Sequence, residues 1–274
     1  MPRTQATPPK LHQLVPSSRR HGIGTSVNIK PLAGDSLGTR SMAVGVETRD
    51  VKLVIDPSAA LGPRRYGLPP HPLERRRLRK HWKRITGYAR DADVIIVTHY
   101  HYDHHNPDEN LDIYAGRTVL VKHPTHSINR SQMRRAAYFL EKLKNTASSV
   151  RYCDGHIFKF GSTTTRFSKA VFHGTDPTLG YVVECLVEEG SDRFIHTSDV
   201  EGPTQLDQLQ FILKHKPNVV LLDGPLTYML GTRFSPADLD ASLRNMVKIV
   251  ERCPLETLIV DHHLLRDLQF RERI

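Results

Sequence analysis

The sequence predicts an α/β (α+β) protein in which two β-sheets pack face to face and helices cover their outer sides. Short runs of β-branched and apolar residues alternate with longer segments in which apolar residues recur every three to four positions. The chain has 274 residues, enough for one large domain, and it contains no short-period repeat. Several of the short runs end directly in histidine or aspartate, which places polar side chains at the ends of buried strands.

The first half of the chain predicts strands followed by helices. Residues 1–25 contain scattered prolines and little apolar periodicity, so we expect a flexible basic tail before an ordered domain over residues 26–274. A loop rich in proline and glycine covers residues 61–72, a basic helix follows over residues 73–85, and a second helix covers residues 127–145. The runs typical of strands are residues 27–32, 42–47, 51–55, 94–98 and 118–121.

The second half is predicted to be richer in strands. A helix is expected over residues 204–214. Another helix begins after Ser235, because a serine cap is followed by Pro236 at the first helical position and by the acidic Asp238, and it runs to about residue 252. The runs typical of strands are residues 156–160, 164–172, 181–187, 193–196, 219–222 and 258–260.

Net charge, hydropathy and cysteine content indicate which partners and which cellular compartment to expect. The formal net charge of +10 favours anionic partners such as nucleic acid, phosphorylated metabolites or acidic headgroups. No run approaches the roughly 18 apolar residues that a membrane-spanning helix requires, so we expect no membrane partner. Cys153, Cys185 and Cys253 are scattered, which argues against a disulfide framework and indicates a reducing, cytoplasmic location.

A dense polar motif follows the apolar run over residues 94–98. His99, His101, Asp103 and His104 form the pattern H-x-H-x-D-H within six residues. Burying four such side chains without partners would cost several kcal/mol. A metal ion would remove that cost, so the motif predicts metal ligands.

Further candidate ligands follow strand-like runs downstream: His173, Asp199, Asp223 and the adjacent His262 and His263. Ligands of α/β proteins collect at the carboxyl ends of strands, which favours a shared site. Imidazole and carboxylate ligands suit zinc, manganese or iron. Asp223 belongs to an Asp-Gly-Pro sequence, so an ordinary turn is an equal alternative for it. His105 is interpreted as a core or supporting residue, and His196 as a core imidazole.

These motifs, in this order, resemble the ligand motifs of the metallo-β-lactamase superfamily. The matching residues are His99, His101, Asp103, His104, His173, Asp199 and a C-terminal histidine, with Asp56 at the superfamily's first acidic position. Residues 35–41, 55–72 and 261–267 further resemble an uncharacterised, largely archaeal group of predicted hydrolases within that superfamily. The resemblance covers about residues 26–274 and implies a four-layer αββα sandwich.

The resemblance also implies a dinuclear metal site with two divalent ions, zinc or else manganese or iron. His99, His101 and His173 would hold the first ion. Asp103, His104 and the last histidine would hold the second, and Asp199 would bridge the two. Two cations about 3.5–4 Å apart can activate a hydroxide and clamp the attacking and leaving oxygens. Asp103 would be ionised and would orient this nucleophile.

The choice between His262 and His263 rests on strand geometry. Adjacent residues of a strand point in opposite directions, so only one of them should be a ligand. The position directly after the strand favours His262, with His263 as the substitute. Asp56 and Asp223 are expected behind the ligands.

The proline-rich loop supplies candidates for binding substrate. Arg64, Arg65, Tyr66 and His71 lie in it, and paired arginines suit recognition of phosphate or carboxylate. The alternative is that the prolines only stiffen a connection.

The sequence therefore predicts a metal-dependent hydrolase that acts on a phosphodiester or another phosphorylated anion, either a small molecule or nucleic acid. One alternative is a lactone, thioester or amide hydrolase with the same site. Another is a nucleic-acid-binding protein with a structural metal site, which the basic tail and the basic helix would support. A homo-oligomer is left open.

Overall fold

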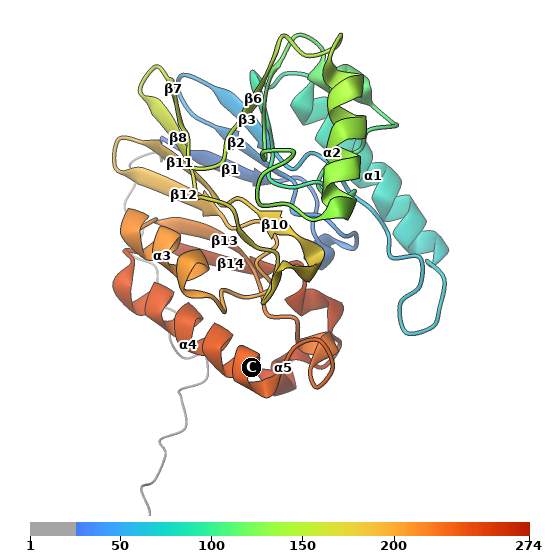
Figure 1. The fold of residues 1–274 in the computed structure, drawn as a ribbon, viewed down its shortest axis with the longest axis vertical. Coiled ribbons are helices and arrows are strands. Elements are labelled where there is room, and N and C mark those ends of the chain that lie inside the picture. The colour runs from blue at the N-terminus through green and yellow to red at the C-terminus, as the bar shows by residue number, and fades with distance from the viewer. Residues whose placement is uncertain (1–25) are drawn as a thin grey trace, which may run out of the picture.

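The computed structural model describes residues 26–274, so the predicted basic tail over residues 1–25 lies outside the described residues. The described chain forms four layers (Figure 1): two helices, a six-stranded sheet, a second six-stranded sheet and two further helices. This confirms the αββα sandwich. No helix among residues 26–274 combines the length and the apolar character needed to cross a membrane.

The first sheet has the strand order β1-β2-β3-β4-β5-β6. Its first three strands are antiparallel, and β3 to β6 are parallel. Parallel neighbours need crossover connections, and the helices α1 and α2 provide two of them. The elements are β1 (Asn28–Pro31), β2 (Val44–Glu47), β3 (Lys52–Ile55), α1 (Pro72–Ala89), β4 (Val94–Val97), β5 (Thr118–Val121), α2 (Arg130–Leu143) and β6 (Ser149–Tyr152).

The second sheet has the strand order β14-β13-β12-β11-β8-β7, with β12, β13 and β14 parallel. Helices α3 and α4 cover its outer face (Figure 1). The elements are β7 (Ile157–Phe160), β8 (Thr163–Phe167), β9 (Val171–Phe172), β10 (Tyr181–Val182), β11 (Cys185–Glu189), β12 (Asp192–His196), α3 (Leu206–His215), β13 (Val219–Asp223), α4 (Pro236–Arg252), β14 (Thr257–Asp261) and α5 (Phe270–Arg273).

Two predicted strands are each broken in the structure. The runs 164–172 and 181–187 divide into β8 with β9 and β10 with β11, and β9 pairs with β10 as a separate two-stranded sheet. At the break, the Ser168 hydroxyl oxygen accepts a hydrogen bond from the Glu184 backbone N–H at 2.9 Å. The side chain thus replaces a backbone partner, and the chain leaves the second sheet just before His173.

β6 was not predicted because its sequence lacks the expected apolar pattern. Its residues, Ser-Val-Arg-Tyr, are exposed or half-buried, and it closes the edge of the first sheet beside β5. α5 was also missed, since one turn of helix leaves little periodicity in a sequence.

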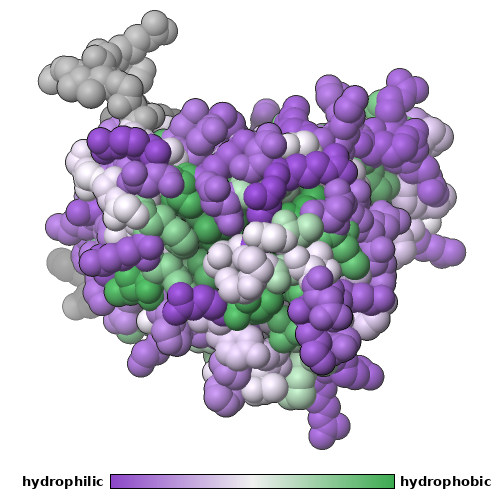
Figure 2. Space-filling model, turned by 90° about the horizontal axis from the view of Figure 1, so that it is seen from above, coloured by the Kyte–Doolittle hydropathy of each residue, from purple (hydrophilic) through white to green (hydrophobic). Residues whose placement is uncertain are grey.

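The apolar core has one layer between the sheets and one under each pair of helices. The position of β4 in the middle of the first sheet explains why its sequence is continuously apolar. Ile96 packs between the sheets, whereas Ile95 and Val97 pack under the helices, so both faces of this strand are buried. The surface seen in Figure 2 is mostly hydrophilic, with hydrophobic residues in patches between charged ones.

The contact between β2 and α1 predicts a steric constraint at Gly45. A Cβ atom there would lie 2.3 Å from Cζ of Tyr88, so Gly45→Ala must displace the tyrosine ring. We expect this overpacking to lower the free energy of unfolding by about 1–3 kcal/mol, measured by urea denaturation. Gly87→Ala is the matched control, because nothing lies within 4 Å of its added Cβ. An equal unfolding midpoint for both variants would contradict this packing.

Candidate metal centre

The loop after β4 forms the centre of the polar cluster. The backbone N–H groups of His104 and His105 both donate to the carbonyl oxygen of His101, at 3.0 and 3.2 Å, which closes a tight turn. This turn brings the ring of His104 beside that of His99, with centroids 4.1 Å apart. Thr98, the residue before the motif, shares a 2.6 Å hydrogen bond with the hydroxyl of Ser198, so the end of β4 is tied to the end of β12 in the other sheet.

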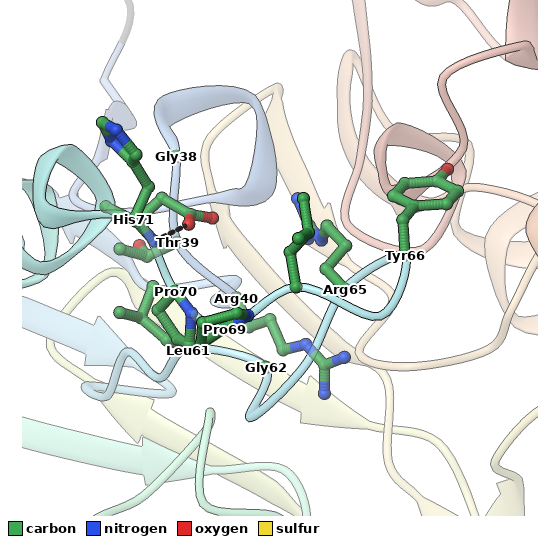
Figure 3. Close-up of a pocket in the computed structure, with 12 residues that line it drawn as sticks. Gly38, Thr39, Arg40, Leu61, Gly62, Arg65, Tyr66, Pro69, Pro70 and His71 are labelled. Carbon is green, nitrogen blue, oxygen red and sulfur yellow. Dashed lines mark hydrogen bonds between the residues drawn. The ribbon is translucent and has the colours of Figure 1, made fainter.

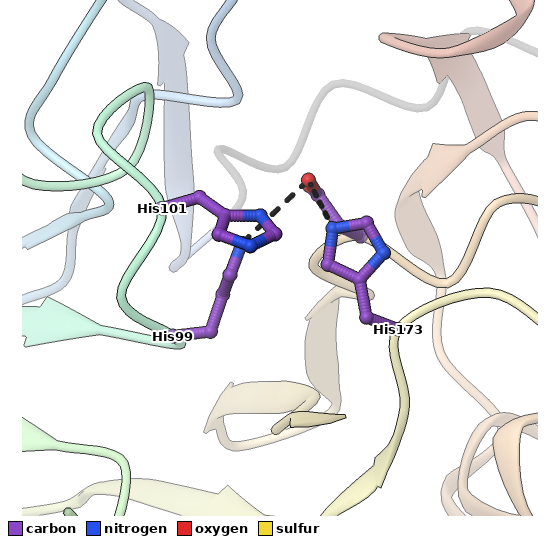
Figure 4. A group of neighbouring side chains, drawn as sticks. His99, His101 and His173 are labelled. Atoms are coloured by element: carbon purple, nitrogen blue, oxygen red, sulfur yellow. Dashed lines mark ion pairs between the residues drawn. The ribbon is translucent and has the colours of Figure 1, made fainter. Parts of the chain in front are cut away.

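A first group of side chains comprises His99, His101, His173 and Asp199. One ligand atom from each lies within 4.8 Å of the others. Nε2 of His173 is 3.2 Å from Oδ2 of Asp199, and Nε2 of His99 is 3.7 Å from the same oxygen. Figure 4 shows the rings of His99, His101 and His173 turned toward one another. The four residues come from three separate strand ends, and they could hold a metal ion.

A second group comprises Asp103, His104 and His262. Nε2 of His104 and Nε2 of His262 lie 3.9 and 3.8 Å from the two carboxylate oxygens of Asp103. Asp199 also contacts this group, with Oδ1 at 3.0 Å from His104 and Oδ2 at 3.3 Å from His262. Asp199 therefore lies between the two groups. The structure brings together all seven residues for which the sequence predicted a ligand role.

His262 and His263 face different partners. His262 adopts a φ of 62°, which ends β14 and directs its Nε2 toward Asp199 and Asp103. Nδ1 of His263 instead hydrogen-bonds Asp223 at 2.9 Å. His263 also belongs to a third group with Asp199 and His262. The geometry favours His262 in the second group, as the strand argument predicted, with His263 close by.

Asp56 and Asp223, the two predicted supporting carboxylates, lie behind the imidazoles. Oδ2 of Asp56 is 2.8 Å from Nδ1 of His104, and Asp56 also accepts hydrogen bonds from the backbone and hydroxyl of Thr98. Asp223 accepts the backbone N–H of Glu201 at 2.7 Å and pairs with His263. A carboxylate on the far nitrogen fixes the orientation of a ligating imidazole and raises its basicity.

Two further carboxylates lie beside the outer nitrogens of candidate ligands and were missed. Asp35 lies 2.9 Å from Nδ1 of His262, and Glu201 lies 3.4 Å from Nδ1 of His173. Asp35 belongs to the segment 35–41 that carries the family resemblance. Glu201 follows Asp199 by only two residues. Both residues therefore stand in or near a motif that the sequence analysis recognised. Neither motif indicates which histidine the carboxylate contacts.

Backbone strain is concentrated at this centre. Four non-glycine residues at strand ends around it have positive φ: Asp56, Ser198, Glu201 and His262, with values of 50°, 58°, 53° and 62°. Such conformations cost about 1–3 kcal/mol each and persist where the surrounding structure holds them in place. The local backbone is therefore organised around the position of these side chains.

The buried atoms of the centre lack ordinary partners. Among residues 26–274, Nε2 of His99, Nε2 of His104 and Oδ1 of Asp199 are buried without a hydrogen bond. Nε2 of His104 and Oδ1 of Asp199 are 3.0 Å apart without the alignment of a hydrogen bond. Unsatisfied buried polar atoms are costly. Two ring nitrogens, of His99 and His104, face one carboxylate without a hydrogen bond to it, which fits a cation between them.

The charges of the centre also suit a cation. Burial lowers the pKa of His99 and of His101 well below the usual value, so both rings are neutral, as metal ligands must be. Burial alone would raise the pKa of Asp199 and Asp103, but His104 and His262 outweigh it and hold both carboxyl groups below their usual pKa. Both carboxylates therefore remain ionised. Burial alone would lower the pKa of His104 and of His262, but Asp199 in turn raises the pKa of His104 and raises that of His262 to about 10, so without a metal ion these two rings carry protons that a bound cation would displace.

Arg266 lies beside the second group and was not predicted. Its side chain is buried, and Nη2 lies 2.9 Å from Nε2 of His262 and 3.5 Å from Oδ2 of Asp103. Nε lies 3.3 Å from Asp35. The first group has no such neighbour among the described residues. A cation in the second group would be closer to this guanidinium charge than a cation in the first.

The four candidate substrate-binding residues of the proline-rich loop do not all line the same pocket. Arg65, Tyr66 and His71 line a pocket of about 380 Å³, whereas Arg64 is exposed and is not part of its lining (Figure 3). Arg65 pairs with Asp35 at 3.1 Å, and the Tyr66 hydroxyl donates to the backbone carbonyl of Arg266 at 3.1 Å. The loop is thus attached to the supports of the metal centre.

His71, His105 and His196 have structural contacts of their own. Nδ1 of His71 accepts the backbone N–H of Leu73 at 3.2 Å and caps α1. Burial lowers the pKa of His105 to about 4, and its ring packs on Phe139 in the core. Nε2 of His196 is 2.9 Å from the carbonyl oxygen of Met42, as expected for a core imidazole with a hydrogen-bond partner.

The support of His104 by Asp56 predicts the effect of Asp56→Asn. Asparagine tolerates the positive φ at this position, but it removes the charge behind the imidazole. We expect metal affinity to fall about 10- to 100-fold with the fold retained, measured by chelator competition and circular dichroism. Asp240→Asn, which changes an exposed carboxylate of α4, is the control and should bind metal normally. Unchanged affinity in Asp56→Asn would contradict this role.

The position of Arg266 predicts two unequal binding steps. In a calorimetric titration with zinc, Arg266→Gln should tighten the weaker step by about tenfold or more, because a nearby positive charge is removed. The tighter step should change much less. Arg76→Gln removes an exposed arginine of α1 and should alter neither step. Equal steps in the unaltered protein, or equal tightening of both, would argue against this asymmetry.

Comparison with known proteins identifies relatives and a shared fold. No family model matches the chain. The UPF0282 protein of Korarchaeum cryptofilum is 55% identical over 248 residues, covering 90% of this chain and 82% of the relative. The UPF0282 protein of Sulfurisphaera tokodaii is 47% identical over 245 residues, covering 88% and 79%.

Two solved structures resemble the fold at low sequence identity. Isothiocyanate hydrolase from Delia radicum gut bacteria has a TM-score of 0.52 at 16% identity, covering 82% of this chain and 83% of its own. The metallo-β-lactamase fold protein YhfI from Bacillus subtilis has a TM-score of 0.52 at 14% identity, covering 81% and 78%. These findings confirm the resemblance seen in the sequence: the chain belongs to the UPF0282 family of archaeal proteins and has the metallo-β-lactamase fold.

Proposed function

We propose that this protein is a metal-dependent hydrolase whose substrate is a phosphodiester or another phosphorylated anion. The observation that carries the proposal is the convergence of seven imidazole and carboxylate side chains, six of them grouped around Asp199, from the ends of strands in both sheets. A structural metal site usually needs only four ligands in a closed tetrahedron. Seven candidate ligands beside a pocket favour a reactive centre over a structural one.

We assign the metal ligands as the sequence predicted them. His99, His101 and His173 hold one ion, Asp103, His104 and His262 hold a second, and Asp199 lies between the two. The mixture of imidazoles and carboxylates suits zinc, manganese or iron. Divalent cations bound there would lower the pKa of water and neutralise charge that develops on the leaving oxygen.

Asp103 is the residue that orients the nucleophile in this proposal. Its side chain is 16% exposed, whereas those of His104 and Asp199 are at most 2% exposed, so Asp103 lies at the accessible side of the cluster. Its carboxylate is ionised and lies 3.5 Å from Arg266, which restrains it. It can accept a hydrogen bond from an attacking water and hold that water in one orientation.

The preference for an anion follows from charge. The chain carries a net charge of +10, and Arg40 and Arg65 line a pocket in which Arg65 contacts Asp35, the partner of His262. Guanidinium groups suit phosphate and carboxylate oxygens. The isothiocyanate hydrolase with a similar fold acts on a different kind of substrate, so the fold supports hydrolysis without choosing the substrate.

A chromogenic aryl phosphodiester tests this proposal. Metal-loaded protein should hydrolyse it, and His101→Ala should lose more than about 100-fold in kcat/KM, because a direct ligand should matter at least as much as its outer partners. His156→Ala, which removes an exposed histidine outside the cluster, should keep full activity and metal content.

Other outcomes would point elsewhere. Turnover of lactones, thioesters or amides without turnover of any phosphodiester would favour the second class of hydrolase. Salt-dependent binding of nucleic acid that survives chelation and Asp103→Ala, without turnover of any substrate, would favour a binding protein with a structural site.

A further inference from the structure

The pocket beside the metal centre has the size of a small-molecule site. It lies between residues 38–40 and residues 61–74, with a volume of about 380 Å³ (Figure 3). Sites for small ligands have volumes of roughly 300–1,000 Å³, largely apolar walls and a few polar groups. Here Leu61, Leu68 and Pro69 contribute apolar wall, and two arginines contribute positive charge.

The two arginines of this pocket differ in their partners. Arg65 is paired with Asp35 at 3.1 Å. Arg40 forms no ion pair with any residue between 26 and 274, and its Nε is buried without a hydrogen-bond partner. A guanidinium keeps its charge at all ordinary pH values. A half-buried cation without a partner is costly, and an anionic ligand would remove that cost.

Arg40 shares the pocket with Arg65 and Tyr66, which contact residues that support the metal centre. Arg65 pairs with Asp35 at 3.1 Å, and the Tyr66 hydroxyl donates to the backbone carbonyl of Arg266 at 3.1 Å. Burial lowers the pKa of Arg40, and so does the positive charge of Arg266, whereas the carboxylate of Asp103 raises it. The guanidinium is therefore within electrostatic range of a residue in the second ligand group. An anion that bridged Arg40 and the metal centre would also separate the two guanidinium charges.

The position of Arg40 is fixed by its neighbours. Its backbone N–H donates to the carbonyl of Ala60 at 3.0 Å, and the Ala60 N–H donates back at 2.9 Å. The guanidinium lies against Gly62, where an added Cβ would come within 2.9 Å of Nη2. The backbone that carries the guanidinium is thus fixed before a ligand binds, which lowers the ordering cost of binding.

We propose that Arg40 binds the anionic group of the substrate beside the metal centre, and that the pocket takes a small organic phosphate whose apolar part lies against Leu61, Leu68 and Pro69. This inference rests on the proposed hydrolase function. It gives the substrate a class: a compact phosphate ester with an apolar or aromatic group, bound by one arginine. Arg64 has no part in it, because its side chain lies outside the pocket.

Binding and kinetics with three variants test the proposal. Inorganic phosphate and phenyl phosphate are titrated into metal-loaded protein by calorimetry, and KM and kcat are measured with an aryl phosphodiester. Arg40→Gln should weaken binding of both probes by about tenfold or more and raise KM, while metal content stays unchanged. Phenyl phosphate should bind the unaltered protein more tightly than inorganic phosphate, because of the apolar wall.

Gly62→Ala is the second variant, because it displaces the guanidinium while leaving the charge and the fold in place. It should weaken both probes in the same direction as Arg40→Gln. Arg76→Gln removes an equal charge from the exposed face of α1 and should leave binding and KM unchanged.

The outcomes separate the two proposals. Phosphodiester turnover with unaltered KM and phosphate affinity in Arg40→Gln would overturn the role of Arg40 and leave the hydrolase standing. An equal loss in Arg40→Gln and Arg76→Gln would reduce the effect to net charge and would also overturn it. Phosphate binding that depends on Arg40 without turnover of any phosphate ester would support the anion pocket and overturn the proposed hydrolysis.

Discussion

The imidazole and carboxylate side chains of the metal centre are buried where the two sheets meet. Each of these buried groups needs a hydrogen-bond partner or an opposite charge. Asp199 faces four imidazoles at 3.0 to 3.7 Å, and it stays ionised because their attraction outweighs the cost of burial. Their outer nitrogens are held by further groups, among them Asp56 behind His104 and Asp35 behind His262. The positive φ values at the strand ends and the break in the strands before His173 place these side chains in the centre.

Two arginines near the metal centre differ in the partners of their charged groups. Arg266 is fully engaged with Asp35, Asp103 and His262, so its charge is balanced inside the protein. Arg40 forms no ion pair with any residue between 26 and 274, and it lines the pocket in which Arg65 contacts Asp35. The two guanidinium groups therefore differ in how far the described residues balance their charge.

Much of this architecture follows from local sequence. Apolar runs buried on both faces, such as β4, can be recognised because strands of a parallel sheet need no polar side. The start of α4 follows from Ser235 and Pro236, whose effects on helix ends act over only a few residues. The H-x-H-x-D-H motif and the polar residues after later strands identified the predicted ligands, because ligands collect at the carboxyl ends of strands, here in both sheets.

Other features depend on residues far apart in the chain, and the sequence by itself could not pair them. Asp35 meets His262 across 227 positions, and Glu201 meets His173 through a break in two predicted strands. The roles of Arg266 and Arg40 depend on which groups lie near them: Arg266 has three partners, and Arg40 has no ion pair among residues 26–274. Residue type determined which chemistry was available, and local pattern determined the strands. Only the packing of the two sheets decided which charges are balanced within the protein and which one is left for a ligand.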